Sequence, residues 1–248
     1  TGFLVNKIDD YYEEEIPSVA VLPFENKGPK EDDFYSYSIT SDLISDLSSV
    51  DRVRVASLYQ TQHIDLSSVN LKDLAKKLES RHIVTGSLWK RDKVFQLSVE
   101  LYDTHKKTIL WSDHWYENWN TLGNIKSKLI EGILFTLNIE EHEDLGVSNK
   151  SSYATEAYEK YLKGKYIYRT RSKPEDIAVC QKLIKESLKL DPNLLKANII
   201  LAETYYYKGE YNKAINVYKE CLGKSKELNR KKEAGRCLNG IGNVLFEK

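Results

Sequence analysis

The chain of 248 residues contains no methionine and carries no excess of charge of either sign. Lys and Arg together number 37, and Asp and Glu together also number 37, so no overall basic field is present to attract nucleic acid. No run of about 18 apolar residues occurs, so no segment of the sequence is expected to cross a membrane as a helix. The composition, 41% hydrophobic and 30% charged, predicts a globular fold with no nucleic acid as partner.

Cysteine is also scarce, with three residues, Cys180, Cys221 and Cys237, all in the C-terminal part. The number is odd, and the spacings match neither a zinc site nor a disulfide framework. We therefore expect small buried residues at helix contacts, because free cysteine behaves as a small hydrophobic residue. This usage fits a reducing compartment and favours the cytoplasm, and the sequence predicts no metal site.

Motifs that carry chemistry are absent as well. The sequence has no glycine-rich phosphate-binding motif, no H-E-x-x-H and no G-x-S-x-G. The five histidines are scattered along the chain, at His63, His82, His105, His114 and His142. We therefore predict a non-enzymatic chain with no catalytic residue and no cofactor.

Apolar periodicity in the first half alternates between strand and helix spacing. Residues 19–24 are apolar at every position, which is typical of a strand covered on both faces. Residues 94–102 alternate, which predicts a strand with one face toward solvent. In all, strands are expected at residues 19–24, 52–57, 82–90, 94–102 and 108–116, and helices at 39–50, 70–78 and 122–137. This order predicts an α/β fold around a mixed sheet.

Every pattern after Ser152 is helical, and residues 195–228 carry a repeat. A first helix ends at Gly209, and a second follows with Ala214, Tyr218 and Cys221 at helical spacing. This segment resembles the tetratricopeptide repeat (TPR), which predicts an all-α solenoid of helix pairs. A degenerate copy precedes it, and a third copy opens at residue 234, so that about two and a half repeats are expected. A half-repeat leaves an apolar face uncovered, so we expect the natural chain to continue past Lys248.

The first half carries four specific strings. They are Ser-Val-Ala-Val-Leu-Pro-Phe-Glu-Asn at 18–26, Gly-Ser-Leu-Trp-Lys at 86–90, Leu-Ser-Val-Glu-Leu-Tyr-Asp at 97–103 and Leu-Trp at 110–111. Together they resemble the TolB-like N-terminal domain of bacterial signalling proteins. The string at residues 38–43 lacks the family's initial glycine, and the hairpin has Asp92 and Lys93 in place of its usual glycine. These departures affect turns rather than core strands.

The two resemblances predict the domain organisation. Residues 1–15 are expected to form a lead-in, in which Gly2-Phe3-Leu4-Val5 is either the end of an upstream membrane span or an ordinary strand start. Residues 16–142 form the TolB-like α/β domain, 143–151 a linker and 152–248 the TPR region. The resemblance implies a parent protein with an upstream class III adenylate or guanylate cyclase, protein kinase or winged-helix domain. A span before Thr1 would be the chain's link to a membrane and would place it in the periplasm.

The resemblance to TPR proteins implies a concave groove lined by the first helix of each pair. Residue by residue, it places there Tyr158, Tyr161, Lys165, Tyr168, Arg169, Lys196, Ile199, Glu203, Tyr206, Tyr207, Arg236, Asn239 and Asn243. Tyrosine offers large contact area, and Arg and Lys can hold a carboxylate. The expected function is therefore a regulatory module that binds a peptide, a partner domain or a second copy of itself. A purely structural role, in which the tyrosines pack between helices, is the alternative.

Two further possibilities concern the first half. The polar loop at residues 26–33 follows the most buried strand, so the α/β unit could be a small-molecule sensor with a ligand near its strand ends. Trp111 and Trp115 share a strand face, which fits either an aromatic binding platform or packing within the core. The sequence leaves both questions to the structure.

Overall fold

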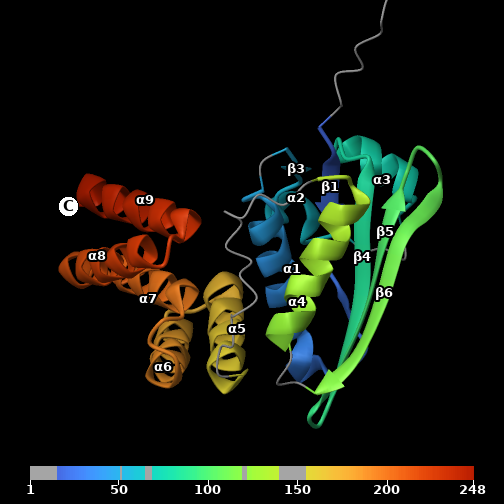
Figure 1. The fold of residues 1–248 in the computed structure, drawn as a ribbon. Helices are drawn as coiled ribbons and strands as arrows, with labels where there is room; N and C mark the ends of the chain where they lie inside the picture. Colours follow the sequence, from blue (N-terminus) through green and yellow to red (C-terminus); the bar gives the residue numbers. More distant parts are fainter. Residues whose placement is uncertain (1–15, 51, 65–68, 119–121, 140–154) are drawn as a thin grey trace, which may run out of the picture.

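A computed structural model describes residues 16–50, 52–64, 69–118, 122–139 and 155–248. The lead-in at residues 1–15 and the predicted linker at 143–151 lie outside the described residues. Within the described part, an α/β unit comes first and an array of helices follows (Figure 1).

The sheet of the α/β unit is mixed, as the sequence predicts. Its main path runs β3 (Arg54–Val55), β1 (Ser18–Val21), β4 (His82–Arg91), β5 (Val94–Asp103) and β6 (Thr108–Asn118), while the short β2 (Glu25–Asn26) also pairs with β4. Strand β1 runs parallel to β3 and β4, whereas β4, β5 and β6 are successively antiparallel. Two tight connections therefore build the antiparallel part, and helices connect the parallel strands.

Helices cover both faces of the sheet around β1. The helices α1 (Asp33–Leu47) and α4 (Leu122–Thr136) pack on one face, and α3 (Leu71–Lys77) packs on the other (Figure 1). Val19 and Val21 point into the α1 side, while Ala20 and Leu22 join the apolar cluster beside α3. The expectation of a strand buried on both faces is confirmed. Short helical turns, η1 (Lys30–Asp32) and α2 (Leu58–Thr61), complete the unit.

The outer strands show the predicted alternation and settle the role of the tryptophans. On β5, Phe95 and Leu97 are buried, and Gln96 between them lies on the more open face. Trp115 is 5% exposed, and the indole of Trp111 lies against Gly132 of α4, where a Cβ atom would come within 2.5 Å of the ring. Both tryptophans therefore pack against the covering helix and form no exposed platform.

In the described residues 155–248, five helices follow the α/β unit. They are α5 (Thr155–Thr170), α6 (Glu175–Leu190), α7 (Leu195–Tyr207), α8 (Tyr211–Glu227) and α9 (Lys231–Glu247). Each packs against the next in the chain. Gly209, with φ of +72°, ends α7 in the left-handed conformation that glycine adopts without strain. Cys180, Cys221 and Cys237 are all buried in this array and unbridged, as expected from the sequence.

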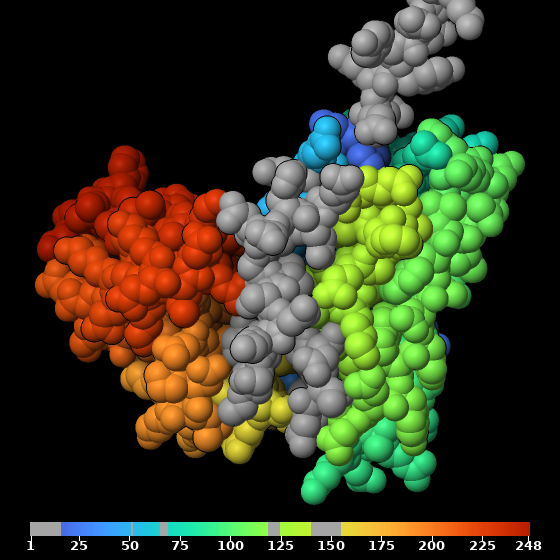
Figure 2. Space-filling view, in the orientation of Figure 1, coloured from blue at the N-terminus to red at the C-terminus, as the bar shows by residue number. Residues whose placement is uncertain are grey.

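The helix array and the α/β unit share one hydrophobic cluster. Helix α1 lies between them, with Leu43 and Leu47 in the cluster that also contains Tyr158 and Leu162 of α5 (Figure 1). In the space-filling view of Figure 2, the helix array lies on the left and the α/β unit on the right. The packing of α1 against α5 fixes the position of the candidate site.

Candidate functional site

The candidate site begins with two carboxylates on the side of α1 that faces the helix array. Asp42 and Asp46 are separated by one turn, so they project from the same side of the helix. One turn earlier on this side, the Ser38 hydroxyl donates to the Leu162 carbonyl at 2.9 Å. Further toward the start of α1, the Tyr35 hydroxyl donates to the Glu159 carboxylate at 2.5 Å. A polar strip of α1 thus lies along residues 158–165 of α5.

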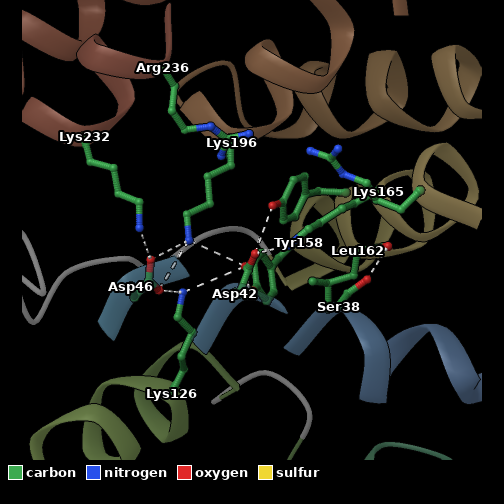
Figure 3. A network of polar contacts seen from close by, with 12 residues as sticks. Ser38, Asp42, Asp46, Lys126, Tyr158, Leu162, Lys165, Lys196, Lys232 and Arg236 are labelled. Atoms are coloured by element: carbon green, nitrogen blue, oxygen red, sulfur yellow. Dashed lines mark hydrogen bonds and ion pairs between the residues drawn. The ribbon is translucent and has the colours of Figure 1, made fainter. Parts of the chain in front are cut away.

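Asp42 is the most enclosed group of the site, with a relative exposure of 1%. Its Oδ1 accepts from Lys165 Nζ at 2.5 Å and from the Tyr161 hydroxyl at 3.2 Å, and its Oδ2 accepts from the Tyr158 hydroxyl at 2.8 Å (Figure 3). Lys196 Nζ lies 3.6 Å from Oδ2. Because a buried carboxylate is costly unless its lone pairs are satisfied, these partners make its burial possible.

Asp46 forms ion pairs with lysines from three other helices (Figure 3). Lys126 of α4 pairs with its Oδ2, and Lys196 of α7 lies 3.0 Å from its Oδ1. Lys232 of α9 is 4.0 Å from Oδ1 and also donates to the Ser49 hydroxyl at 3.0 Å. With α5, which supplies the partners of Asp42, four helices thus meet around one side of α1. We call these residues the interface network: Asp42, Asp46, Lys126, Tyr158, Tyr161, Lys165, Lys196 and Lys232.

The electrostatics of the interface network keep both carboxylates charged. Burial opposes their ionisation, but the facing ammonium groups outweigh it and hold the pKa of Asp42 and of Asp46 well below the usual value. Burial and the Asp42 charge raise the pKa of Tyr158 and of Tyr161, so both phenols stay protonated as donors. Burial also lowers the pKa of Lys232 to about 8, an effect that Asp46 only partly offsets. Lys232 is therefore the weakly held cation of the network.

Lys232→Met is expected to raise the free energy of unfolding at pH 7.5, because burial disfavours the Lys232 ammonium group and Asp46, 4.0 Å away, only partly offsets that cost. The pKa of Lys232 is lower in the folded state than in the unfolded chain. The folded state therefore binds fewer protons between about pH 8 and the usual lysine pKa, and stability rises with pH across that window. Urea unfolding at pH 7.5 and 9.5 should show this rise in the parent and a smaller rise in the variant. An equal rise in both would contradict the assignment.

Part of the predicted groove lies beneath α1. Tyr158, Tyr161, Lys165 and Lys196 belong to the interface network, and each is less than 9% exposed. Two more predicted groove positions, Tyr168 and Ile199, are also buried. These six positions do not form an open surface in this structure, because a segment of the same chain with complementary charge covers the first four. They offer another protein no accessible face.

The other predicted groove positions are partly or fully exposed. They are Arg169, Glu203, Tyr206, Tyr207, Arg236, Asn239 and Asn243, and we call them the residual groove. At its centre the Glu203 carboxylate lies between two guanidinium groups, 3.5 Å from Arg169 and 3.4 Å from Arg236. One carboxylate thus faces two arginines, which leaves a local surplus of positive charge.

Sequence reasoning missed Asp42, Asp46, Lys126 and Lys232. A signal for the two carboxylates was present: they share a predicted helix with Ile39, Leu43 and Leu47, whose spacing identifies one apolar side. Nothing in the local pattern indicates that the other side of this helix is buried too. Lys126 and Lys232 have no distinguishing context, because their partner lies far away in the sequence.

The polar loop proposed as part of a sensor is held by its own hydrogen bonds. Asn26 Nδ2 donates to the Pro29 carbonyl at 2.7 Å and to Asp33 Oδ1 at 2.8 Å, and its Oδ1 accepts from the Gly28 amide at 2.9 Å. The Asn26 amide is thus used within the loop, and a ligand at this loop stays a prediction. Across the described ranges, no group of three His, Cys, Asp or Glu side chains is placed to hold a metal ion. Among the helices in the described part of the chain, none combines the length and apolar character needed to cross a bilayer.

Comparison with known proteins gives matches to a regulator domain and to a cyclase. Residues 14–131 match the family model described as the second domain of HilA/YgeH-like transcriptional regulators. A putative adenylate cyclase 3 of Rhizobium meliloti (strain 1021) is 20% identical over 192 residues, which cover 75% of this chain and 32% of that protein. The chain therefore spans about a third of the length of the curated relative that it matches.

Several solved structures match part of this chain with low TM-scores. TolB from Acinetobacter baumannii gives a TM-score of 0.39 at 14% identity, covering 54% of this chain and 31% of that one. The C-terminal domain of LpoB from Salmonella enterica gives a TM-score of 0.33 at 13% identity, covering 42% of this chain and 84% of that one. The chain is thus similar in sequence to a regulator domain and to a putative cyclase, and its mixed α/β sheet has TolB and LpoB among its structural neighbours.

Proposed function

We propose that this chain is a non-catalytic regulatory module of a larger bacterial signalling protein, in which a TolB-like α/β unit is joined to TPR-type helix pairs. The match to a putative adenylate cyclase supports a cyclase-like parent, and the regulator-domain match supports a regulatory role. The described residues supply no metal cluster, and the buried charges pair with one another. The module acts by binding, and incubation with nucleoside triphosphates should yield neither a cyclic nucleotide nor free phosphate.

The interface network is the observation that carries this proposal. Two carboxylates of α1 pair with lysines from four other helices, so the helix array has one favoured position against the α/β unit. Charged groups inside an interface give specificity of arrangement, because any other register leaves a charge buried without a partner. A partner bound to the helix array would therefore be held in a fixed orientation relative to the α/β unit. A regulatory module requires such a fixed connection between its partner-binding part and its other part.

The residual groove is the surface that this module offers to a partner. Arg169 and Arg236 both form ion pairs with the Glu203 carboxylate, and Tyr207, one turn after Glu203 on α7, is 52% exposed. Arginines hold carboxylates in charge-assisted hydrogen bonds, and tyrosine supplies contact area. The partner that fits this chemistry is a peptide segment with acidic side chains. Self-association through the same groove requires an acidic segment from a second copy.

A displayed library of random peptides tests the groove directly. Selection on the full chain should enrich peptides rich in Asp and Glu. Arg169→Ala combined with Arg236→Ala should weaken the selected peptides at least about tenfold, since each charged hydrogen bond contributes about 1.5–3 kcal/mol. Lys182→Ala combined with Lys189→Ala removes the same charge from exposed positions of α6 and should leave affinity unchanged. Equal losses in both double variants would show charge attraction without a groove.

A further inference from the structure

A basic hollow lies at the end of the sheet where β1, β3 and β4 begin. Its volume is about 1530 Å³, and its lining includes Arg52, Lys72, Lys76, Lys106 and Lys107. These five side chains come from the start of β3, from α3 and from the turn between β5 and β6, which lie at the same end of the sheet in Figure 1. All five residues are exposed. The hollow concentrates positive charge in a chain whose net charge is zero.

The carboxylates of the basic hollow are already paired. Asp103 Oδ2 accepts from Arg81 Nη2 at 2.8 Å, and Glu79 lies 3.5 Å from Arg54 Nη1. Within the described part of the chain, neither carboxylate forms an ion pair with any of the five cations named above. The hollow therefore has five lysines and arginines that can bind a negatively charged ligand.

Two of these cations occupy backbone positions that favour glycine. Arg52 has φ of 68° and Lys107 has φ of 57°, both in the left-handed region. Glu79 and Asn138, which also line the hollow, have φ of 49° and 55°. A side chain in this region is strained relative to glycine, and such residues gather at functional sites. Arg52 and Lys107 thus place long cationic side chains at positions where glycine would be less strained.

We propose that the basic hollow binds a small soluble molecule that carries several phosphate groups. Lysine and arginine side chains donate several hydrogen bonds to phosphate oxygens, and cations on different sides of the hollow match an anion with its charge spread over several groups. The concave shape favours a small ligand over a bilayer, because a flat membrane surface would not reach the buried part of the lining, which includes Ser80 and His82.

Isothermal titration of the full chain with inorganic tripolyphosphate tests the proposal. We expect saturable binding with one molecule per chain. Lys72→Gln combined with Lys76→Gln should weaken it at least tenfold, whereas Lys182→Gln combined with Lys189→Gln on exposed positions of α6 should not. Arg52→Gly combined with Lys107→Gly should weaken binding as strongly while leaving the melting temperature unchanged or higher, because glycine relieves the strained backbone. This last pair separates ligand binding from folding.

Several outcomes would overturn the proposal. They are the absence of saturable binding, equal loss in the α6 control, and binding only to phosphatidylglycerol vesicles or duplex DNA. The site is independent of the residual groove, so Arg169→Ala combined with Arg236→Ala should retain full tripolyphosphate affinity. Failure of one proposal therefore leaves the other standing.

Discussion

Asp42→Ala is expected to lower the free energy of unfolding by about 3–5 kcal/mol, the range seen when one partner of a buried ion pair is removed. The substitution leaves Lys165, which is 7% exposed, without the carboxylate that lies 2.5 Å from its ammonium group. It also removes the acceptor of the Tyr158 and Tyr161 hydroxyls. Urea unfolding followed by far-ultraviolet circular dichroism and by tryptophan fluorescence measures the loss. Because all four tryptophans lie in the first half, fluorescence reports on the α/β unit.

Three controls separate charge from packing. Asp42→Asn keeps an oxygen acceptor for the tyrosines but removes the charge, so it should cost less than Asp42→Ala. Asp42→Leu combined with Lys165→Met should recover part of the stability, because it removes the unpaired Lys165 charge but leaves the Tyr158 and Tyr161 hydroxyls without the Asp42 acceptor. Glu220→Ala removes an exposed carboxylate of α8 and should cost less than about 0.5 kcal/mol. A loss below about 1 kcal/mol for Asp42→Ala would show that the interface network does not hold the two parts together.

The pH dependence of this contribution has a definite sign. The pKa of Asp42 is lower in the folded state than its usual value near 3.8, so the folded chain binds fewer protons than the unfolded chain in that range. The stabilisation is therefore fully present above the unfolded pKa and is lost as the pH falls through the folded pKa. The interface is expected to survive mild acid, and Asp42→Asn should flatten the acid limb of the stability curve.

Local sequence patterns predict the strands and helices of this protein well, because each pattern records which faces of one strand or helix are buried. Residues 94–102 alternate because one face of β5 is buried, and residues 19–24 are continuously apolar because β1 is covered on both sides. The helix around Leu43 follows from the same logic. The second covered side of α1 could not be predicted in this way. Its partners are at residues 158–165, 196 and 232, and no local period records a contact across such a separation.

The missed contact also changes how the predicted groove is interpreted. The resemblance to TPR proteins placed Lys165 and Lys196 on a surface for a partner, and the chemistry it implied, cations that hold a carboxylate, is what the structure contains. The carboxylates come from α1 of the same chain. The residue types therefore predicted that these lysines bind a carboxylate. Only the tertiary structure shows that the carboxylates belong to α1 of the same chain. The surplus positive charge at Arg169 and Arg236 leaves the same chemistry available to a second acidic segment.

Gly240→Ala and Gly242→Ala are expected to change stability in opposite directions although they lie two residues apart on α9. A Cβ atom at Gly240 would lie 2.3 Å from Cζ of Tyr218, which is 4% exposed on α8. The tyrosine ring would have to move, and such overpacking costs about 1–3 kcal/mol. At Gly242 no atom lies within 4 Å of the added Cβ, so alanine should raise the free energy of unfolding by about 0.5–1 kcal/mol through its higher helix propensity.

Thermal unfolding of the two variants beside the parent measures both effects under the same conditions. Lower stability of Gly240→Ala together with higher stability of Gly242→Ala would show that α8 and α9 approach closely at one face and that the opposite face of α9 is open. Equal shifts would contradict the packing of Tyr218 on Gly240. Close approach through a small residue on one helix and a large residue on the other is the contact expected within a TPR-type helix array. The sign of the Gly240→Ala effect therefore tests the architecture on which the residual groove depends.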